Sequence, residues 1–420
     1  MSLLVLIIVV GFSIAVVYHY VMGYYFGKPW PANTFLHTPQ ARFWDFKLVV
    51  HQSAALDPFG EDIGGFAGSP FAQFVGYLFS LVRPALLQLL VFFGSFFVVF
   101  ILMVKHHLYG LKTRLTAHQL LAIFAIVFLT YPVLFAVDRA NFDLLVVPLL
   151  FLFALTYGRQ QHKTSTVFLA LAIALKPYTA IFAIVYFLDK RFRDGLLVIF
   201  NAVFLTALSL SLFKDGLFVE TQKYFTDLSH TVDYLSVGSQ QVFTSDLYSL
   251  LTVTMKSVGD VLNADIFLPA HPVARVSYAV TAAIVAVYFV IRLWEKPRPL
   301  WKTMAVLTIL IILLPINSHD YRLTYLFVPM LMYLGTNEDS RKALLTIILW
   351  GLLLVPKAYY HLQPPQNIGM VINPLLLIGL LVCIIPDAFS IKGIPSATRF
   401  VCKKLQSIGP NRKLANPRSS

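Results

Sequence analysis

The sequence predicts an all-α protein that crosses a membrane many times. Of its 420 residues, 58% are hydrophobic and only 13% are charged, and the mean hydropathy is +0.74. Soluble domains carry about 25% charged residues, so this composition is typical of a polytopic membrane protein. The second observation is that the apolar residues fall in long segments separated by short polar connections. These segments lie at about residues 2–22, 84–104, 118–136, 142–157, 165–188, 195–213, 273–293, 301–317, 321–335, 342–356 and 368–389.

The first apolar segment, residues 2–22, is long enough to span a bilayer. It has neither a basic start nor a small-x-small cleavage site, and we therefore expect an uncleaved first helix. The cysteines are Cys383 and Cys402, one in a late apolar segment and one near the C-terminus, which predicts neither a disulfide nor a zinc site. The sequence contains no 20–50-residue repeat, no P-loop and no Rossmann glycine pattern.

The net charge of +13 is explained by topology, and we predict no nucleic-acid partner. Short connections rich in Lys and Arg are expected on the cytoplasmic side. All of these connections lie on one side only if segment 165–188 enters the membrane and returns. That arrangement predicts ten crossings and one re-entrant pair, with both termini inside. The basic connections are residues 105–114, 159–163, 190–193, 292–302, 341–342 and the tail 392–418.

Lys176 and Pro177 lie in the middle of segment 165–188. A lysine at that depth is unfavourable unless it faces protein or water, and proline interrupts the helical hydrogen bonds beside it. Broken, charged segments of membrane proteins usually line cavities. Each arm of about eleven residues is too short to cross at 1.5 Å per residue. A kinked helix with a satisfied lysine, crossing as an eleventh span, is the alternative.

This topology also predicts the domain organisation and the positions of the long loops. Residues 1–389 form one transmembrane domain with two long outer loops, 23–83 and 214–272, and residues 390–420 form a basic cytoplasmic tail. In the first loop, residues 45–55 and 70–82 are short amphipathic or apolar stretches that suit interfacial helices. Most acidic residues fall on the outer side under this topology, so we expect the chemistry there and not in the cytosol.

Asp45 is flanked by Phe43, Trp44 and Phe46 in the first loop. A carboxylate among aromatic side chains at a membrane surface is partly desolvated, which suits a general base. Asp45 is alternatively a helix cap or a partner of Arg42 or Lys47. A second acidic group, which comprises Asp57, Glu61 and Asp62, has the composition of a solvated turn, with a metal site as the less favoured alternative.

Two short outer connections carry further polar residues. The first, residues 138–143, contains Arg139, Asn141 and Asp143, with helix capping by Asn141 as the alternative to a binding role. The second, residues 315–322, contains His319, Asp320 and Arg322. Arg322 is suited to clamping a phosphate, whereas Asp320 and Arg322 are alternatively a surface ion pair. Residues 238–248 mix polar and aromatic side chains, a weak signal for sugar contacts.

Together these residues resemble the polyprenyl-phosphate-dependent glycosyltransferases of family 87, in the GT-C superfamily of mannosyl- and arabinofuranosyltransferases. The likeness covers most of residues 1–335. It rests on Trp44-Asp45-Phe46 with Ala54-Ala55-Leu56-Asp57-Pro58-Phe59, on Ser69-Pro70-Phe71, on Arg139-Ala140-Asn141, on Ala174-Leu175-Lys176-Pro177-Tyr178, and on residues 315–322. The chain departs from the family pattern at Arg139-Ala140, where Gly-Gln is usual, and in residues 315–322, which lack a tryptophan.

The resemblance implies a GT-C-like fold in a bacterial inner membrane and a role in building the cell envelope. It implies inverting transfer of mannose, arabinofuranose or a similar sugar from a polyprenyl-phosphate donor to a glycan or glycolipid acceptor on the extracytoplasmic face. Asp45 would be the catalytic base. Lys176, Arg139 and Arg322 would bind the donor phosphate, and Asn141, Asp143, His319 and Asp320 would hold sugar or acceptor oxygens. No metal site is predicted and no cofactor beyond the lipid-linked donor, although some GT-C enzymes use a divalent cation.

A lipid-linked sugar flippase is the competing interpretation, because it too would have many spans and a broken helix with a buried charge. The absence of an internal inverted repeat and the large acidic outer loops favour the enzyme. A non-catalytic partner in an envelope complex is the third possibility.

Overall fold

The computed structural model describes residues 1–60, 68–236, 243–262, 272–336, 341–359 and 367–389. Within these ranges the chain is helical, and its one β-type pairing is an isolated bridge between Thr244 and His319. The α-helices are α1 (Ser2–Tyr20), α2 (Trp44–Ser53), α3 (Pro70–Ser80), α4 (Ala85–Tyr109), α5 (Ala117–Phe128), α6 (Tyr131–Arg139), α7 (Asp143–Gly158), α8 (His162–Leu175), α9 (Ile184–Leu188), α10 (Phe192–Leu212), α11 (Gly216–Ser236), α12 (Leu247–Leu262), α13 (Pro272–Glu295), α14 (Leu300–Leu313), α15 (Phe327–Leu334), α16 (Arg341–Leu354) and α17 (Gly369–Ile384). Short turns of other helix types are η1 (Val21–Tyr25), η2 (Pro39–Ala41), η3 (Pro177–Ala183), η5 (Asp320–Leu326) and η6 (Pro386–Phe389).

The apolar helices fit a membrane protein. Four of them, α1, α4, α10 and α13, are long and apolar enough to cross a bilayer, and the pair α5–α6, bent by 51°, gives a fifth candidate. Further apolar helices of 10–17 residues, among them α7, α8, α14 and α17, are shorter than a full crossing requires. The all-helical class is confirmed for the described residues, whereas the count of ten crossings stays a prediction.

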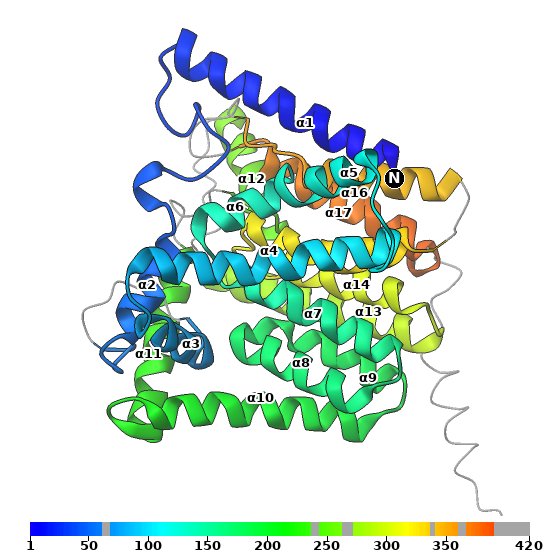
Figure 1. Cartoon of the computed structure of the whole chain (residues 1–420). Helices are drawn as coiled ribbons and strands as arrows, with labels where there is room; N and C mark the ends of the chain where they lie inside the picture. Colours follow the sequence, from blue (N-terminus) through cyan, green and yellow to red (C-terminus); the bar gives the residue numbers. More distant parts are fainter. Residues whose placement is uncertain (61–67, 237–242, 263–271, 337–340, 360–366, 390–420) are drawn as a thin grey trace, which may run out of the picture.

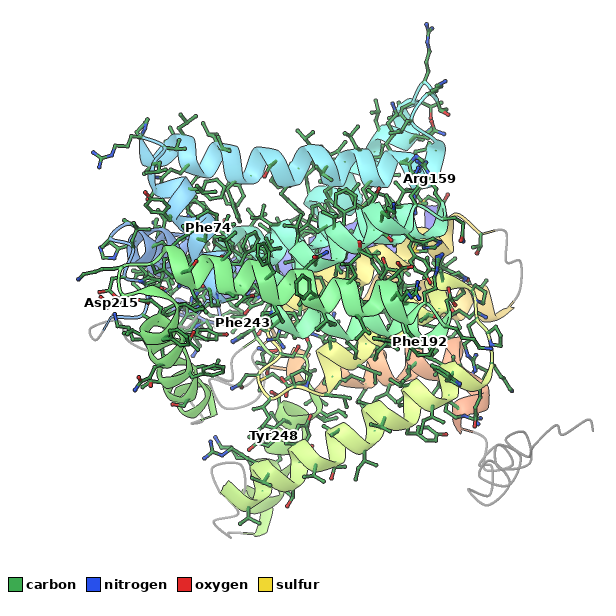
Figure 2. The ribbon with its side chains drawn as sticks, turned by 90° about the horizontal axis from the view of Figure 1, so that it is seen from below. Phe74, Arg159, Phe192, Asp215, Phe243 and Tyr248 are labelled. Atoms are coloured by element: carbon green, nitrogen blue, oxygen red, sulfur yellow. The ribbon has the colours of Figure 1, made fainter. Side chains whose placement is uncertain are left out.

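The long helices run between two ends of the molecule (Figure 1). Helices α2, α3 and α11 gather at one end, which we call the loop end. The opposite end, which we call the basic end, holds the connections 105–114, 159–163, 189–193 and 292–302. A hydrogen-bonding distance of 3.5 Å between Arg159 Nη2 and His106 Nε2 joins the first two connections. Figure 2 shows Arg159 and Phe192 at this end, and Phe74 and Asp215 at the other.

Segment 165–188 bends back on itself, as predicted. Helix α8 ends at Leu175, Lys176 is extended with φ −141°, and η3 and α9 return. The two arms are joined near their bases, where the Ser165 and Tyr186 hydroxyls are 2.6 Å apart. Both ends of the segment therefore lie at the basic end, and the Lys176-Pro177 tip lies on the opposite side. The segment is therefore a hairpin of two helical arms and not one straight kinked helix.

Helix α14 forms the centre of the core, because nearly all of its side chains are buried. Helices α10 and α13 instead expose rows of large apolar side chains, including Phe200 and Ile284, which are 66% and 65% exposed. In water such faces would be costly, and a lipid environment accounts for them.

Candidate active site

The first long loop is fixed onto the helix ends that carry the polar connections. The Phe43 N–H donates to the Asp138 carbonyl at 2.7 Å, and the His37 N–H donates to Asp138 Oδ2 at 3.1 Å. At the start of α3, the Ser69 hydroxyl lies 2.7 Å from the carbonyl of Ala174, directly before the tip of the re-entrant segment. Two distant parts of the chain, the first loop and the Lys176 tip, are thereby held at one place.

Asp45 is buried in the first turn of α2 and is held by the 138–143 connection. Arg139 Nη2 donates to Asp45 Oδ1, and Asn141 Nδ2 donates to Asp45 Oδ2 at 2.6 Å. The charged partner of Asp45 is thus Arg139; the predicted alternatives behave differently, since Arg42 faces Asp138 at 3.7 Å and Lys47 lies over the Phe43 ring. We call Asp45, Arg139 and Asn141 the carboxylate group.

Asn141 connects this group to Asp143. Its side-chain oxygen accepts from the Asp143 N–H at 2.9 Å, which places it beside the start of α7 as well as on Asp45. The second contact is of the capping type, and the predicted role of Asn141 in binding sugar or acceptor oxygens stays a prediction. Asp143 Oδ1 lies 4.0 Å from Lys176 Nζ. Lys176 and Asp45 are thus linked through Asn141 and Asp143.

Asp143 is fully buried and organises two tyrosines. Its Oδ1 accepts hydrogen bonds from Tyr178, at 2.6 Å, and from Tyr325, and the two phenol oxygens are 3.0 Å apart. Its Oδ2 has no hydrogen-bond partner among the described residues. Asp143 thus lies beside Lys176 and orients the hydroxyl groups of Tyr178 and Tyr325.

Arg322 lies on the other side of Tyr178. Its guanidinium carbon is 4.3 Å from the centre of the Tyr178 ring, a cation–π contact. Its Nε and Nη1 are buried and have no hydrogen-bond partner among the described residues. We call Asp143, Lys176, Tyr178, Arg322 and Tyr325 the cation group. It carries two positive charges and one negative charge, and an arginine with unused donors is suited to a phosphate.

Sequence comparison agrees with the earlier resemblance. The sequence model of glycosyltransferase family 87 matches residues 66–315. The chain belongs to glycosyltransferase family 87. The matched range includes Arg139, Asn141, Asp143 and Lys176 but ends before Arg322 and begins after Asp45. No curated protein matches the chain.

His319 and Asp320 of this transferase differ in their surroundings. Burial and the positive charge of Arg322 lower the pKa of His319 to about 4, while Asp45 opposes that shift. His319 is therefore neutral at pH 7 and lies within electrostatic range of both groups. Asp320 instead points into a buried network, where it accepts from Tyr131 at 2.8 Å and from Ser245. It forms no ion pair with Arg322, and its contacts favour a structural role over the predicted sugar contact.

His37 is a site residue of the transferase that sequence reasoning missed. Burial and the charge of Arg139 lower the pKa of His37 to about 4, with Asp45 opposing. Its ring lies 5.7 Å from that of Trp30 and 6.1 Å from that of Phe243. Tyr321 lies within electrostatic range of Asp45, Arg139 and Arg322, and was also missed. Neither residue stands in a local pattern that separates it from ordinary loop aromatics, so only the contacts identify them.

The second acidic group is only partly described, since Glu61 and Asp62 lie outside the described residues. Asp57 pairs with Lys223 at 2.9 Å, and Lys223 also contacts Asp215 at 2.5 Å and Glu220 at 3.2 Å. The three carboxylates lie close enough to hold a metal ion, but the ammonium already contacts all three. We assign this cluster to fastening the first loop onto α11.

Proposed function

We propose that this protein transfers a sugar from a polyprenyl-phosphate donor to an acceptor hydroxyl, with inversion, at the extracytoplasmic face of the inner membrane. Membership of glycosyltransferase family 87 supports a membrane glycosyltransferase. The observation that supports the finer proposal is the adjacency of a carboxylate group and a cation group at the loop end. Mannose and arabinofuranose are the donor sugars that we favour, and an envelope glycan or glycolipid is the acceptor.

The cation group is the proposed phosphate site. Lys176 is 17% exposed and Asp143 is fully buried, so the two positive charges and one negative charge lie largely out of water. An excess buried cation is costly unless an anion accompanies it. A phosphate ester supplies that anion, and Arg322 has unused N–H groups to donate to it. The prenyl tail would lie along the lipid-facing helices.

The carboxylate group is the proposed base. The acceptor oxygen attacks the anomeric carbon from the face opposite the phosphate, its proton passes to Asp45, and the bond between the anomeric carbon and the phosphate oxygen breaks. The electron pair of that bond leaves with polyprenyl phosphate, whose growing charge Lys176 and Arg322 stabilise. Arg139 holds Asp45 in place, and in this proposal its guanidinium also assists the phosphate. In this proposal His319 and Asn141 bind sugar oxygens.

The first prediction is that Asp45→Asn lowers the transfer rate by about 10²–10⁴-fold, because the amide cannot accept the proton. Purified protein in liposomes would receive radiolabelled polyprenyl-phosphate mannose or arabinofuranose together with a lipid extract from its own membrane, and label in the acceptor would be counted. Asp194→Asn, which removes a carboxylate at the basic end, is the matched control and should transfer normally. Near-normal transfer by Asp45→Asn would overturn the assignment. Label that changes leaflet without reaching an acceptor would identify a flippase.

A further inference from the structure

A cavity lies at the basic end, far along α7 from the candidate active site at its N-terminus. Its volume is about 280 Å³. The ends of α7 and α9, the α13–α14 connection and the start of α14 form its walls. Residues that line it include Tyr157, Gln160, Leu188, Asp189, Trp294 and Arg298. None of these belongs to the carboxylate group or to the cation group, so the cavity is a separate site.

The lining carries both signs of charge. Asp189 is held by a hydrogen bond from the Tyr157 hydroxyl, and Arg298 lines the cavity from the α13–α14 connection. Leu188 and Trp294 contribute apolar surface. A ligand that fits both charges has an anionic part for the guanidinium and a cationic part for the carboxylate. A phosphate ester that bears a primary amine meets this requirement in a compact form.

The outer surface of α13 indicates that this ligand is a lipid. Large apolar side chains recur every three or four residues along one exposed face of the helix, as expected for a surface that acyl chains cover. Trp294, 45% exposed, ends this row and lines the cavity, and tryptophan prefers the headgroup level of a bilayer. The members of the row, which we call the α13 stripe, are Val276, Val280, Ile284, Val287, Ile291 and Trp294.

We propose that the cavity binds the phosphoethanolamine headgroup of a membrane phospholipid whose acyl chains lie on the α13 stripe. The phosphate contacts Arg298 and the ammonium contacts Asp189. Because Asp189 directly follows α9, the lipid joins the returning arm of the re-entrant segment to the α13–α14 connection. This inference does not depend on the proposed transferase mechanism, because its test measures lipid retention alone.

The test is native mass spectrometry of protein released from nanodiscs that contain equal amounts of phosphatidylethanolamine and phosphatidylcholine. Trimethylation of the amine removes its hydrogen bonds, so we expect about tenfold preferential retention of one phosphatidylethanolamine. Asp189→Asn should reduce the preference to near parity, and Arg298→Gln should reduce retention of both lipids. Equal retention of the two lipids by the wild-type protein would refute the proposal.

A cavity-filling variant tests the location without changing charge. A Cβ atom at Gly158, which also lines the cavity, would meet nothing closer than Leu300 Cδ2 at 4.0 Å, so the backbone accommodates a side chain there. Gly158→Leu should abolish preferential retention, whereas Asp194→Asn, outside the cavity, should preserve it. Unchanged preference in Gly158→Leu would place the lipid elsewhere. Soluble phosphoethanolamine at millimolar concentration should fail to displace the lipid, and displacement would show that a free headgroup suffices and that the stripe plays no part.

Discussion

The two groups of charged side chains on either side of Asn141 differ in charge balance. In the carboxylate group, Asp45 and Arg139 cancel, and Asn141 occupies the second carboxylate oxygen. In the cation group, Lys176 and Arg322 exceed Asp143 by one charge, and Arg322 retains unused donors. The difference indicates a division of labour. The balanced group needs no bound ion, whereas the unbalanced group has the excess positive charge that the proposed donor phosphate would neutralise.

The largest effect expected from the cation group is that of Arg322. Arg322→Gln should lower kcat by about 10²–10³-fold, because charge builds on the leaving phosphate in the transition state. Arg322→Lys restores the charge but neither the paired donors nor the flat stack on Tyr178, so it should recover only part of the rate. Transfer rates at saturating donor and acceptor would measure both effects.

Arg42→Gln is the control for Arg322, since Arg42 is 59% exposed and its pair with Asp138 contributes little. If Arg322→Gln changes only the donor KM and leaves kcat intact, Arg322 binds the ground state and the transition state equally. The proposed role in stabilising the leaving group would then be wrong.

A smaller effect is expected from Tyr178, which joins Asp143 to Arg322 within the cation group. Tyr178→Phe keeps the ring under Arg322 and removes the hydroxyl, with its hydrogen bond to Asp143 and its contact with the Tyr325 hydroxyl, so we expect about a fivefold loss in kcat/KM. Tyr178→Leu also removes the cation–π contact and should cost a further tenfold. Transfer assays with a donor titration would measure the pair. Equal losses in the two variants would show that the stack does not position Arg322.

The sequence was most informative where a charged or helix-breaking residue lies inside an apolar segment. Lys176 beside Pro177 in an apolar segment predicted a bend and a functional tip, because a buried charge and a missing N–H leave few other solutions. Asp45 was noticed for its aromatic neighbours, and Arg139, Asn141 and Arg322 for lying in short polar turns. Their order along the chain, read as a resemblance, indicated the family that the comparison then showed.

The sequence did not predict which of these residues contact one another. Asp320 and Arg322 are two positions apart, yet one turns into the Tyr131 network and the other onto Tyr178. The partners are nearly 190 and about 145 residues distant along the chain, and no local pattern encodes contacts at such separations. His37 and Tyr321 were missed for the same reason. The number of crossings does not follow from helix length alone, because helices such as α7 and α8 are apolar but individually shorter than a full crossing requires.

The smallest predicted effect concerns pH and the two histidines, His37 and His319, that flank the carboxylate group. Their pKa values in the folded protein are lowered to about 4 by burial, against 6.5 as the ordinary value. As the pH falls below 6.5, the two histidines therefore become protonated in the unfolded chain while they stay neutral in the folded protein. The folded protein loses stability over this range, down to about pH 4. The slope of the unfolding free energy approaches about 1.4 kcal/mol per pH unit for each histidine.

Thermal unfolding in detergent between pH 7.5 and 5 should show a shallower decline in stability for His319→Gln than for the wild type. His118→Gln, at an exposed position on α5, should follow the wild type. An identical decline in His319→Gln and the wild type would mean that His319 takes up its proton in the folded protein. The surroundings of the carboxylate group would then gain positive charge in acid, and the contrast between this group and the cation group would hold only near neutral pH.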